Sequence, residues 1–249
     1  MSTTQRDDER WLVRGERREN PAQRLYCFHH AGGSAAEFTP WSRYLPDTVD
    51  VCAVQLPGRG ARVREQPHTR MRPLLDELLG RLDLDLPFVF FGHSFGALVA
   101  FELAAALDAA GAPLPRHLFL SARPAPGLVA ADTGTIHDLP EQEFLDVVDR
   151  RHGGVPAELR EHRELRDLVL PYFRADYEVI ETYRPGGHEP LALPVTVLGG
   201  TDDEIGVDQL EAWQEHVAGP FEVRMFPGDH FYLRPHRTAV VDLVRAATV

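Results

Sequence analysis

The sequence is poor in cysteine, in long apolar runs and in net positive charge, and each shortage excludes a class of protein. Its 249 residues include 2 cysteines, Cys27 and Cys52, and each lies in an apolar, strand-like run. Thiols in such positions are expected to be reduced core residues rather than a disulfide or a metal pair. No run approaches the roughly 20 apolar residues of a membrane span. The polar N-terminus also lacks the apolar segment of a secretory signal, so we expect a cytoplasmic protein with no membrane partner.

Positive charge is scarce overall but locally concentrated. Against 38 acidic residues the chain has 26 basic ones, a formal net charge of −12, which argues against nucleic acid as a partner. One stretch is nevertheless rich in arginine: Arg59, Arg62, Arg64, Arg70 and Arg72. This stretch is interpreted either as a solvated loop or as a basic patch for an acidic partner.

What is present in quantity is an alternation of strand-like and helix-like segments. Apolar runs typical of doubly buried strands recur at 25–28, 51–55, 88–91, 117–121, 195–198 and 222–226. Helix-like stretches lie between several of them, at 72–82, 97–110, 207–216 and 237–246. This pattern predicts an α/β fold with a mostly parallel central sheet and helices on both faces.

The same pattern predicts the organisation of the chain. Residues 1–22 are expected to form a flexible tail, and residues 23–123 and 195–249 the α/β core. Residues 124–194 contain no convincing strand but three helical stretches, at 141–151, 157–170 and 173–183. A helical insertion between two strands is typical of a lid over a site, although it could also simply cover one face of the sheet.

Residues 92–96, Gly-His-Ser-Phe-Gly, follow a strand-like run and precede a strong helix former. Gly-x-Ser-x-Gly between a strand and a helix is the nucleophile elbow, a strained turn that holds a serine at its tip. A Gly-Ser turn without chemistry is the alternative, and the flanking strand and helix disfavour it. The pattern predicts Ser94 as a nucleophile.

A serine nucleophile needs a base, and the base needs an acid to orient it. In α/β-hydrolases the chain order is serine, acid, histidine, each on a loop after a strand. After the strand at 195–198 come Asp202, Asp203 and Glu204, which all remain candidates at this point. His230 lies on a glycine-containing loop between the last strand and the last helix, which predicts it as the base.

The predicted oxyanion hole takes two backbone N–H groups. One is expected from Phe95, directly after the nucleophile. The other is expected from the glycine-rich loop after the first strong strand, and we choose Ala31. No His-Glu-x-x-His or paired Cys/His spacing occurs, so we expect no metal.

Together these segments resemble the type II thioesterases of polyketide and non-ribosomal peptide biosynthesis, from about residue 23 to the end. The matching motifs are the strand and loop at 25–34, the Pro-Gly-Arg turn at 57–59, the elbow, the stretch at 170–183 and the Gly-Asp-His-Phe loop at 228–231. Two positions depart from the family: His29 stands where many relatives have proline, and the acid turn reads Gly-Thr-Asp-Asp. The resemblance assigns the acid to Asp203, while the doubled aspartate keeps Asp202 open.

The resemblance implies a stand-alone, monomeric α/β-hydrolase that removes stalled or misprimed acyl groups from acyl- or peptidyl-carrier proteins. Ser94 would attack the thioester, His230 would take its proton and Asp203 would orient His230. No cofactor of its own is implied, because the phosphopantetheine arm belongs to the substrate. The alternatives are a carboxylesterase or lipase with the same triad, a releasing domain of a megasynthase, and a non-catalytic carrier-binding module.

Overall fold

The fold is built around a seven-stranded sheet, and the computed structural model describes residues 10–128 and 134–248. The order is β1-β3-β2-β4-β5-β6-β7, with β1 antiparallel to β3 and the other neighbours parallel. The strands are β1 (Leu12–Arg14), β2 (Gln23–Phe28), β3 (Val49–Val54), β4 (Phe88–His93), β5 (Leu118–Ser121), β6 (Val195–Gly200) and β7 (Phe221–Phe226). The helices are α2 (Met71–Leu79), α3 (Phe95–Ala109), α4 (Glu141–His152), α5 (Ala157–Glu161), α6 (Arg163–Thr182), α7 (Val207–Glu211) and α8 (Arg237–Ala246). The predicted mostly parallel α/β sheet is confirmed.

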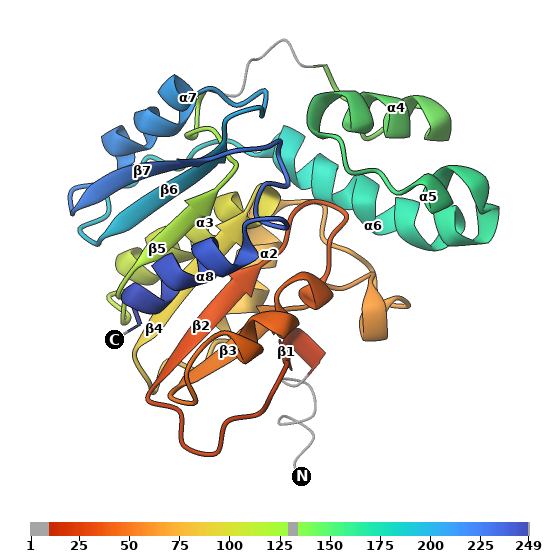
Figure 1. Cartoon of the computed structure of the whole chain (residues 1–249). Helices are drawn as coiled ribbons and strands as arrows, with labels where there is room; N and C mark the ends of the chain where they lie inside the picture. The colour runs from red at the N-terminus through yellow and green to blue at the C-terminus, as the bar shows by residue number, and fades with distance from the viewer. Residues whose placement is uncertain (1–9, 129–133, 249) are drawn as a thin grey trace.

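Helices cover both faces of the sheet because its inner strands are apolar on both sides. Every residue of β2, β3, β4, β5 and β6 is buried. Successive side chains of a strand point to opposite faces. Tyr26 and Phe28 therefore join the core formed with α2 and α3, while Leu25 and Cys27 join the core formed with α8. Figure 1 shows α8 in front of the sheet and α3 behind it.

The predicted flexible tail over residues 1–22 is wrong for its second half. Leu12–Arg14 forms β1 and pairs with β3, Leu12 opposite Val54, while Trp11 is only 2% exposed. A three-residue strand among charged residues gives no periodic signal, so the sequence could not reveal it. Residues 1–9 lie outside the described residues.

The segment between β5 and β6 is helical, as expected, but its last two helices meet at a different residue from the one predicted. The sequence predicts an interruption near Pro171; instead α5 ends at Glu161 and α6 runs from Arg163 through Pro171 to Thr182. Proline removes the bond to the carbonyl four residues earlier. Packing of Leu170, Phe173 and Tyr177 in the small core beneath α4 outweighs that loss. In the described parts of the chain, no helix is both long and apolar enough to cross a membrane.

The boundaries proposed for the insertion, 124 and 194, and its role as a lid stay predictions. Its residues 129–133 lie outside the described residues. In Figure 1, α4, α5 and α6 lie together beyond one end of the sheet. This is the end at which the parallel strands terminate, and where loops after strands collect in such folds.

Candidate active site

Ser94 lies in the sharp turn between β4 and α3. Its φ of 55° is in the left-handed region, which non-glycine residues seldom adopt. The two flanking glycines permit the turn: a Cβ on Gly92 would lie 2.2 Å from the Gly96 carbonyl oxygen, and a Cβ on Gly96 would lie 2.1 Å from the Phe28 oxygen. The Ser94 N–H donates to the Ser121 carbonyl over 2.7 Å, which ties the turn to β5. A strained serine held this firmly is typical of a functional site.

The structure brings Asp203, and not Asp202, against His230. His230 Nδ1 donates to Asp203 Oδ2 over 2.8 Å, and the two side chains are 3% and 1% exposed. The Asp202 residue is exposed, and its carboxylate accepts from the Thr201 hydroxyl instead. Gly200 allows the two loops to meet, because a Cβ there would lie 2.3 Å from the Asp229 carbonyl oxygen. The aspartate fixes the histidine tautomer so that Nε2 is the free, basic nitrogen.

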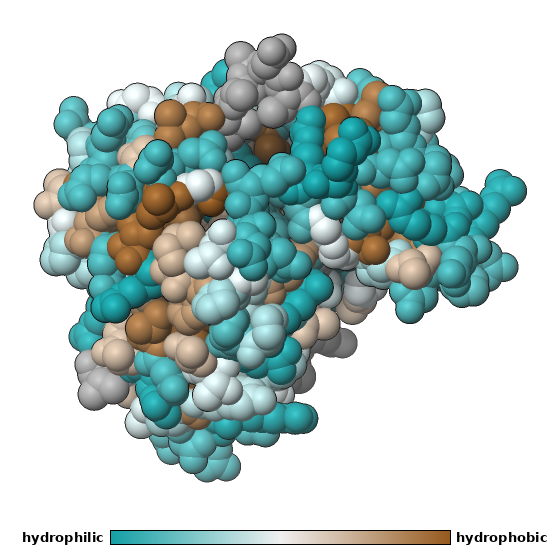
Figure 2. Space-filling view, turned by 45° about the horizontal axis from the view of Figure 1, so that its top comes forward, coloured by the Kyte–Doolittle hydropathy of each residue, from teal (hydrophilic) through white to brown (hydrophobic). Residues whose placement is uncertain are grey.

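Ser94 and His230 border the same two cavities, together with His152 and Tyr177. The first, of about 570 Å³, has walls from α4, α5, α6 and the 228–231 loop, with apolar lining from Val148, Leu159, Val169, Phe173 and Phe231. We call it the apolar cavity. The second, of about 730 Å³, is lined by several charged groups, Arg123, Arg151, Glu181, Arg184 and Glu204, and we call it the polar cavity. In Figure 2 the visible face is mainly hydrophilic, with apolar side chains in separate patches.

The predicted oxyanion donors lie at the expected places. Phe95 begins α3, so its N–H has no partner within the helix. The Ala31 N–H bonds no acceptor among residues 10–128 and 134–248. Ala31 borders both cavities beside Ser94. The catalytic roles of these donors, and of the serine, histidine and aspartate, stay predictions.

A buried ion pair holds the loop that carries Ala31. Asp176 of α6 accepts from Arg59 through both oxygens, over 2.6 and 2.7 Å, and Oδ2 also accepts from the Gly32 N–H over 2.8 Å. Arg59 also donates to the Gly33 carbonyl over 3.3 Å. The Arg59 and Asp176 side chains are 2% and 3% exposed. The Pro-Gly-Arg turn and α6 therefore clamp the oxyanion loop from two sides.

This geometry corrects both interpretations for two of the five arginines, whereas Arg64, Arg70 and Arg72 are exposed as both interpretations expect. Arg59 and Arg62 belong to neither a solvated loop nor a surface patch, since each residue is at most 4% exposed. The Arg62 guanidinium lies 3.7 Å from the centre of the Trp11 ring and donates to the Gln55 carbonyl. Arg70 and Arg72 pair with acidic side chains, Glu178 and Asp76. The stretch therefore offers much less free positive charge than its sequence indicates.

Neutral histidines surround His230. Burial lowers the pKa of His29 and His152 to about 3 and the pKa values of His30 and His93 well below the ordinary value. The His152 ring lies 4.5 Å from that of His230, centre to centre, at 34°. These histidine side chains therefore stay uncharged near neutral pH.

One group of described side chains could hold a metal ion. Ligand atoms of His152, Asp203 and His230 lie within 4.8 Å of one another. Two members of this group, His230 and Asp203, are already hydrogen-bonded to each other. Their closeness is therefore explained by that bond. The expected absence of a metal stays a prediction.

Comparison with known proteins identifies the family. A family model described as a thioesterase domain matches residues 23–248. The chain belongs to the thioesterase family. This thioesterase is 39% identical over 253 residues to the linear gramicidin dehydrogenase LgrE of Brevibacillus parabrevis, covering 99% of this chain and 95% of the relative. It is 34% identical over 238 residues to the gramicidin S biosynthesis protein GrsT of Aneurinibacillus migulanus, covering 94% and 92%.

Solved structures agree with this assignment. The type II thioesterase BorB from the borrelidin biosynthetic cluster matches with a TM-score of 0.83 at 36% identity, covering 95% of this chain and 97% of that one. The resemblance to type II thioesterases and the α/β-hydrolase fold are thus confirmed.

Sequence reasoning missed three residues that border or support this site. His152 and Arg123 lie in stretches without a motif. Asp176 falls within the Arg-Ala-Asp-Tyr stretch that carries the resemblance, but only the fold shows that it holds the oxyanion loop. Composition and spacing give no signal for His152 or Arg123.

Proposed function

We propose that this thioesterase hydrolyses acyl thioesters on the phosphopantetheine arm of acyl- or peptidyl-carrier proteins. Its role is editing: it clears stalled or misprimed acyl groups during polyketide or non-ribosomal peptide biosynthesis. One observation carries the proposal: the chain matches type II thioesterases of such pathways over nearly its whole length. The Asp203–His230 pair beside Ser94 supplies the matching chemistry.

The mechanism starts with attack by Ser94 Oγ on the thioester carbonyl while His230 Nε2 takes the hydroxyl proton. Negative charge develops on the carbonyl oxygen, where the N–H groups of Ala31 and Phe95 stabilise it. Asp203 balances the imidazolium that forms. His230 then returns the proton to the leaving thiolate, and the acyl group remains on Ser94 as an ester.

The second half repeats the chemistry with water. His230 takes a proton from the water as it attacks the ester, and it returns a proton to Ser94 as the acid leaves. The enzyme ends in its starting state, so the cycle requires neither a cofactor nor a metal. We place the cycle in the cytoplasm, where thiols stay reduced, which suits the buried, free cysteines Cys27 and Cys52. The specific carrier protein and the monomeric state are proposals on the same basis.

The test is a panel of acyl groups on a phosphopantetheinylated carrier protein, assayed with wild type and Ser94→Ala. We expect wild type to release several acyl groups and Ser94→Ala to lower kcat by about 10⁴-fold or more. A parallel nitrophenyl ester separates a thioesterase from a general carboxylesterase or lipase. Failure of a fluorophosphonate to label Ser94 in the folded protein would instead favour a non-catalytic binding module.

A further inference from the structure

Arg123 is a buried cation at the active site that the mechanism does not use. It lies two residues after the end of β5, is 9% exposed and borders the polar cavity with Ser94. We propose that Arg123 binds an anionic group of the substrate, a carboxylate or a phosphate, in the polar cavity. The inference rests on the proposed function and adds to it a recognition element for charge.

The backbone on both sides of Arg123 is fixed against the catalytic end of the sheet. The Ser121 carbonyl accepts from the Ser94 N–H, and the Ala122 N–H donates to the Leu198 carbonyl over 2.8 Å. Ala122 has a φ of 50°, which a non-glycine residue seldom adopts. The Arg123 carbonyl accepts from the Trp213 indole over 2.8 Å. A side chain with so firm a base loses little freedom on meeting a ligand.

Within the part of the chain that the structure describes, the charge of Arg123 has no counterpart. Among residues 10–128 and 134–248, no carboxylate pairs with its guanidinium, and its buried Nε has no hydrogen-bond partner. The other deeply buried arginine at this site, Arg59, instead has the full bidentate pair with Asp176. Buried charges are normally paired, so a lone buried cation facing a cavity indicates a partner that arrives from outside.

The tyrosine phenols near Arg123 do not balance its charge. Burial lowers the pKa of Arg123 to about 10, and only the phenols of Tyr183 and Tyr177 oppose that shift. Burial raises the pKa values of both tyrosines, so near neutral pH they are uncharged. The Tyr183 hydroxyl moreover donates to Glu102 over 2.5 Å.

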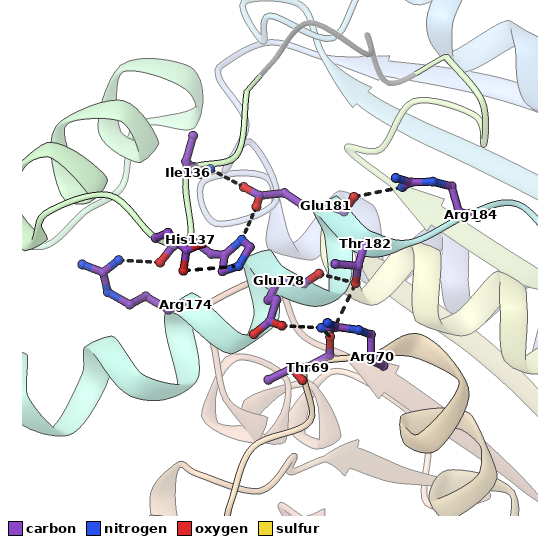
Figure 3. Close-up of polar contacts among 10 residues, drawn as sticks. Thr69, Arg70, Ile136, His137, Arg174, Glu178, Glu181, Thr182 and Arg184 are labelled. Carbon is purple, nitrogen blue, oxygen red and sulfur yellow. Dashed lines mark hydrogen bonds and ion pairs between the residues drawn. The ribbon is translucent and has the colours of Figure 1, made fainter.

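The carboxylates around the polar cavity are engaged elsewhere or lie in solvent. Glu181 accepts from the Ile136 N–H over 2.8 Å and bonds to His137, as Figure 3 shows. Arg184 donates to the main-chain oxygens of Glu181 and Tyr183, and it has no acidic partner among the described residues, so it adds positive charge. Glu204 is exposed. The cavity therefore favours an anion.

A planar guanidinium can bind carboxylate or phosphate oxygens through two parallel hydrogen bonds. In a thioester substrate the anion has two sources. It is either a free carboxylate on the acyl group or the phosphate of the phosphopantetheine arm. Arg123 recognises the same chemistry in both, and matched substrates tell them apart.

The experiment compares wild type, Arg123→Met and Arg123→Lys on two substrate pairs. The first pair, butyryl and succinyl thioesters of N-acetylcysteamine, isolates an acyl carboxylate. The second, butyryl-pantetheine and butyryl-4′-phosphopantetheine, isolates the phosphate. We expect Arg123→Met to lower kcat/KM by about 10- to 100-fold for the anionic member of one pair while sparing its neutral partner. Arg123→Lys should lower kcat/KM for the anionic member less, because lysine keeps the positive charge although it lacks the two parallel donors of the guanidinium.

The pair that responds identifies the anion. Equal effects on both members of both pairs would overturn the proposal, as would no effect on either pair. Arg116→Met is the matched control: it removes the same charge from an exposed residue before β5, at the opposite end of that strand, and should not change the ratio within either pair.

Two further readouts keep the result interpretable. Arg123→Met should melt no lower than wild type, because it replaces an unpaired buried charge by an apolar chain of similar length. A lower Tm would show a structural role and count against the anion site. If wild type hydrolyses none of the four thioesters, the proposed function fails; if it hydrolyses them and charge has no effect, only the role of Arg123 fails.

Discussion

Replacing Asp176 by asparagine should damage stability and catalysis by separate routes. The substitution leaves Arg59 buried without a countercharge, since the pair is 2% and 3% exposed. Breaking a buried pair by removing one partner costs about 3–5 kcal/mol. For a chain of this size each kcal/mol shifts Tm by about 2–4 °C, so we expect Tm to fall by roughly 6–20 °C.

Catalysis should suffer because Asp176 also accepts the Gly32 N–H over 2.8 Å, next to the proposed oxyanion donor Ala31. Losing one oxyanion donor outright costs about 10²–10³ in kcat. A displaced loop keeps part of that donor, so we expect a loss in kcat of about 10- to 100-fold with KM nearly unchanged. The assay is steady-state hydrolysis of a small neutral thioester well below the Tm of the variant.

The double variant Arg59→Met/Asp176→Leu separates the two routes. It leaves no buried charge, so Tm should recover most of the loss. Leucine offers the Gly32 N–H no acceptor, so kcat should stay low. Recovery of both Tm and kcat in the double variant would refute the idea that this carboxylate positions the oxyanion loop.

Two further predictions concern the acid and the buried histidines. Asp203→Asn should lower kcat by about 10⁴-fold, since the amide favours the wrong imidazole tautomer, while the exposed Asp202→Asn should stay within a few-fold; the reverse order would assign the triad acid to Asp202. Burial lowers the pKa of His29 to about 3 and that of His93 well below its ordinary value. Both residues are therefore neutral in the folded state, whereas in the unfolded state they take up protons below about pH 6.5. The folded state is therefore favoured above that pH. Below it, each histidine should lower the free energy of unfolding by up to about 1.4 kcal/mol per pH unit. Urea unfolding between about pH 7 and about pH 5 measures this slope, and a flat profile would contradict it.

The sequence predicted the parts of the site that short motifs encode. The turn at Ser94, and the loops after β6 and β7 that bring Asp203 to His230, each depend on a few neighbouring residues. The Arg59–Asp176 pair joins positions 117 residues apart, so no local pattern could reveal it. For the same reason the sequence presents Arg59 and Arg62 as loop or patch charges, although the fold buries them. β1 is too short to show a hydrophobic period. Pro171 favours a break between two helices, but the packing of α6 overrides that local preference.

Helix α6 contributes both to the wall of the apolar cavity and to the support of the loop that carries Ala31. Its Tyr172 and Phe173 form a wall of the apolar cavity, and its Asp176, one turn further on, holds the loop of the oxyanion hole. Because these residues lie on one helix, a shift of α6 that widens the cavity would also move the carboxylate that accepts from Gly32. The width of the apolar cavity and the position of the loop that carries the predicted oxyanion donor Ala31 are therefore coupled through one helix.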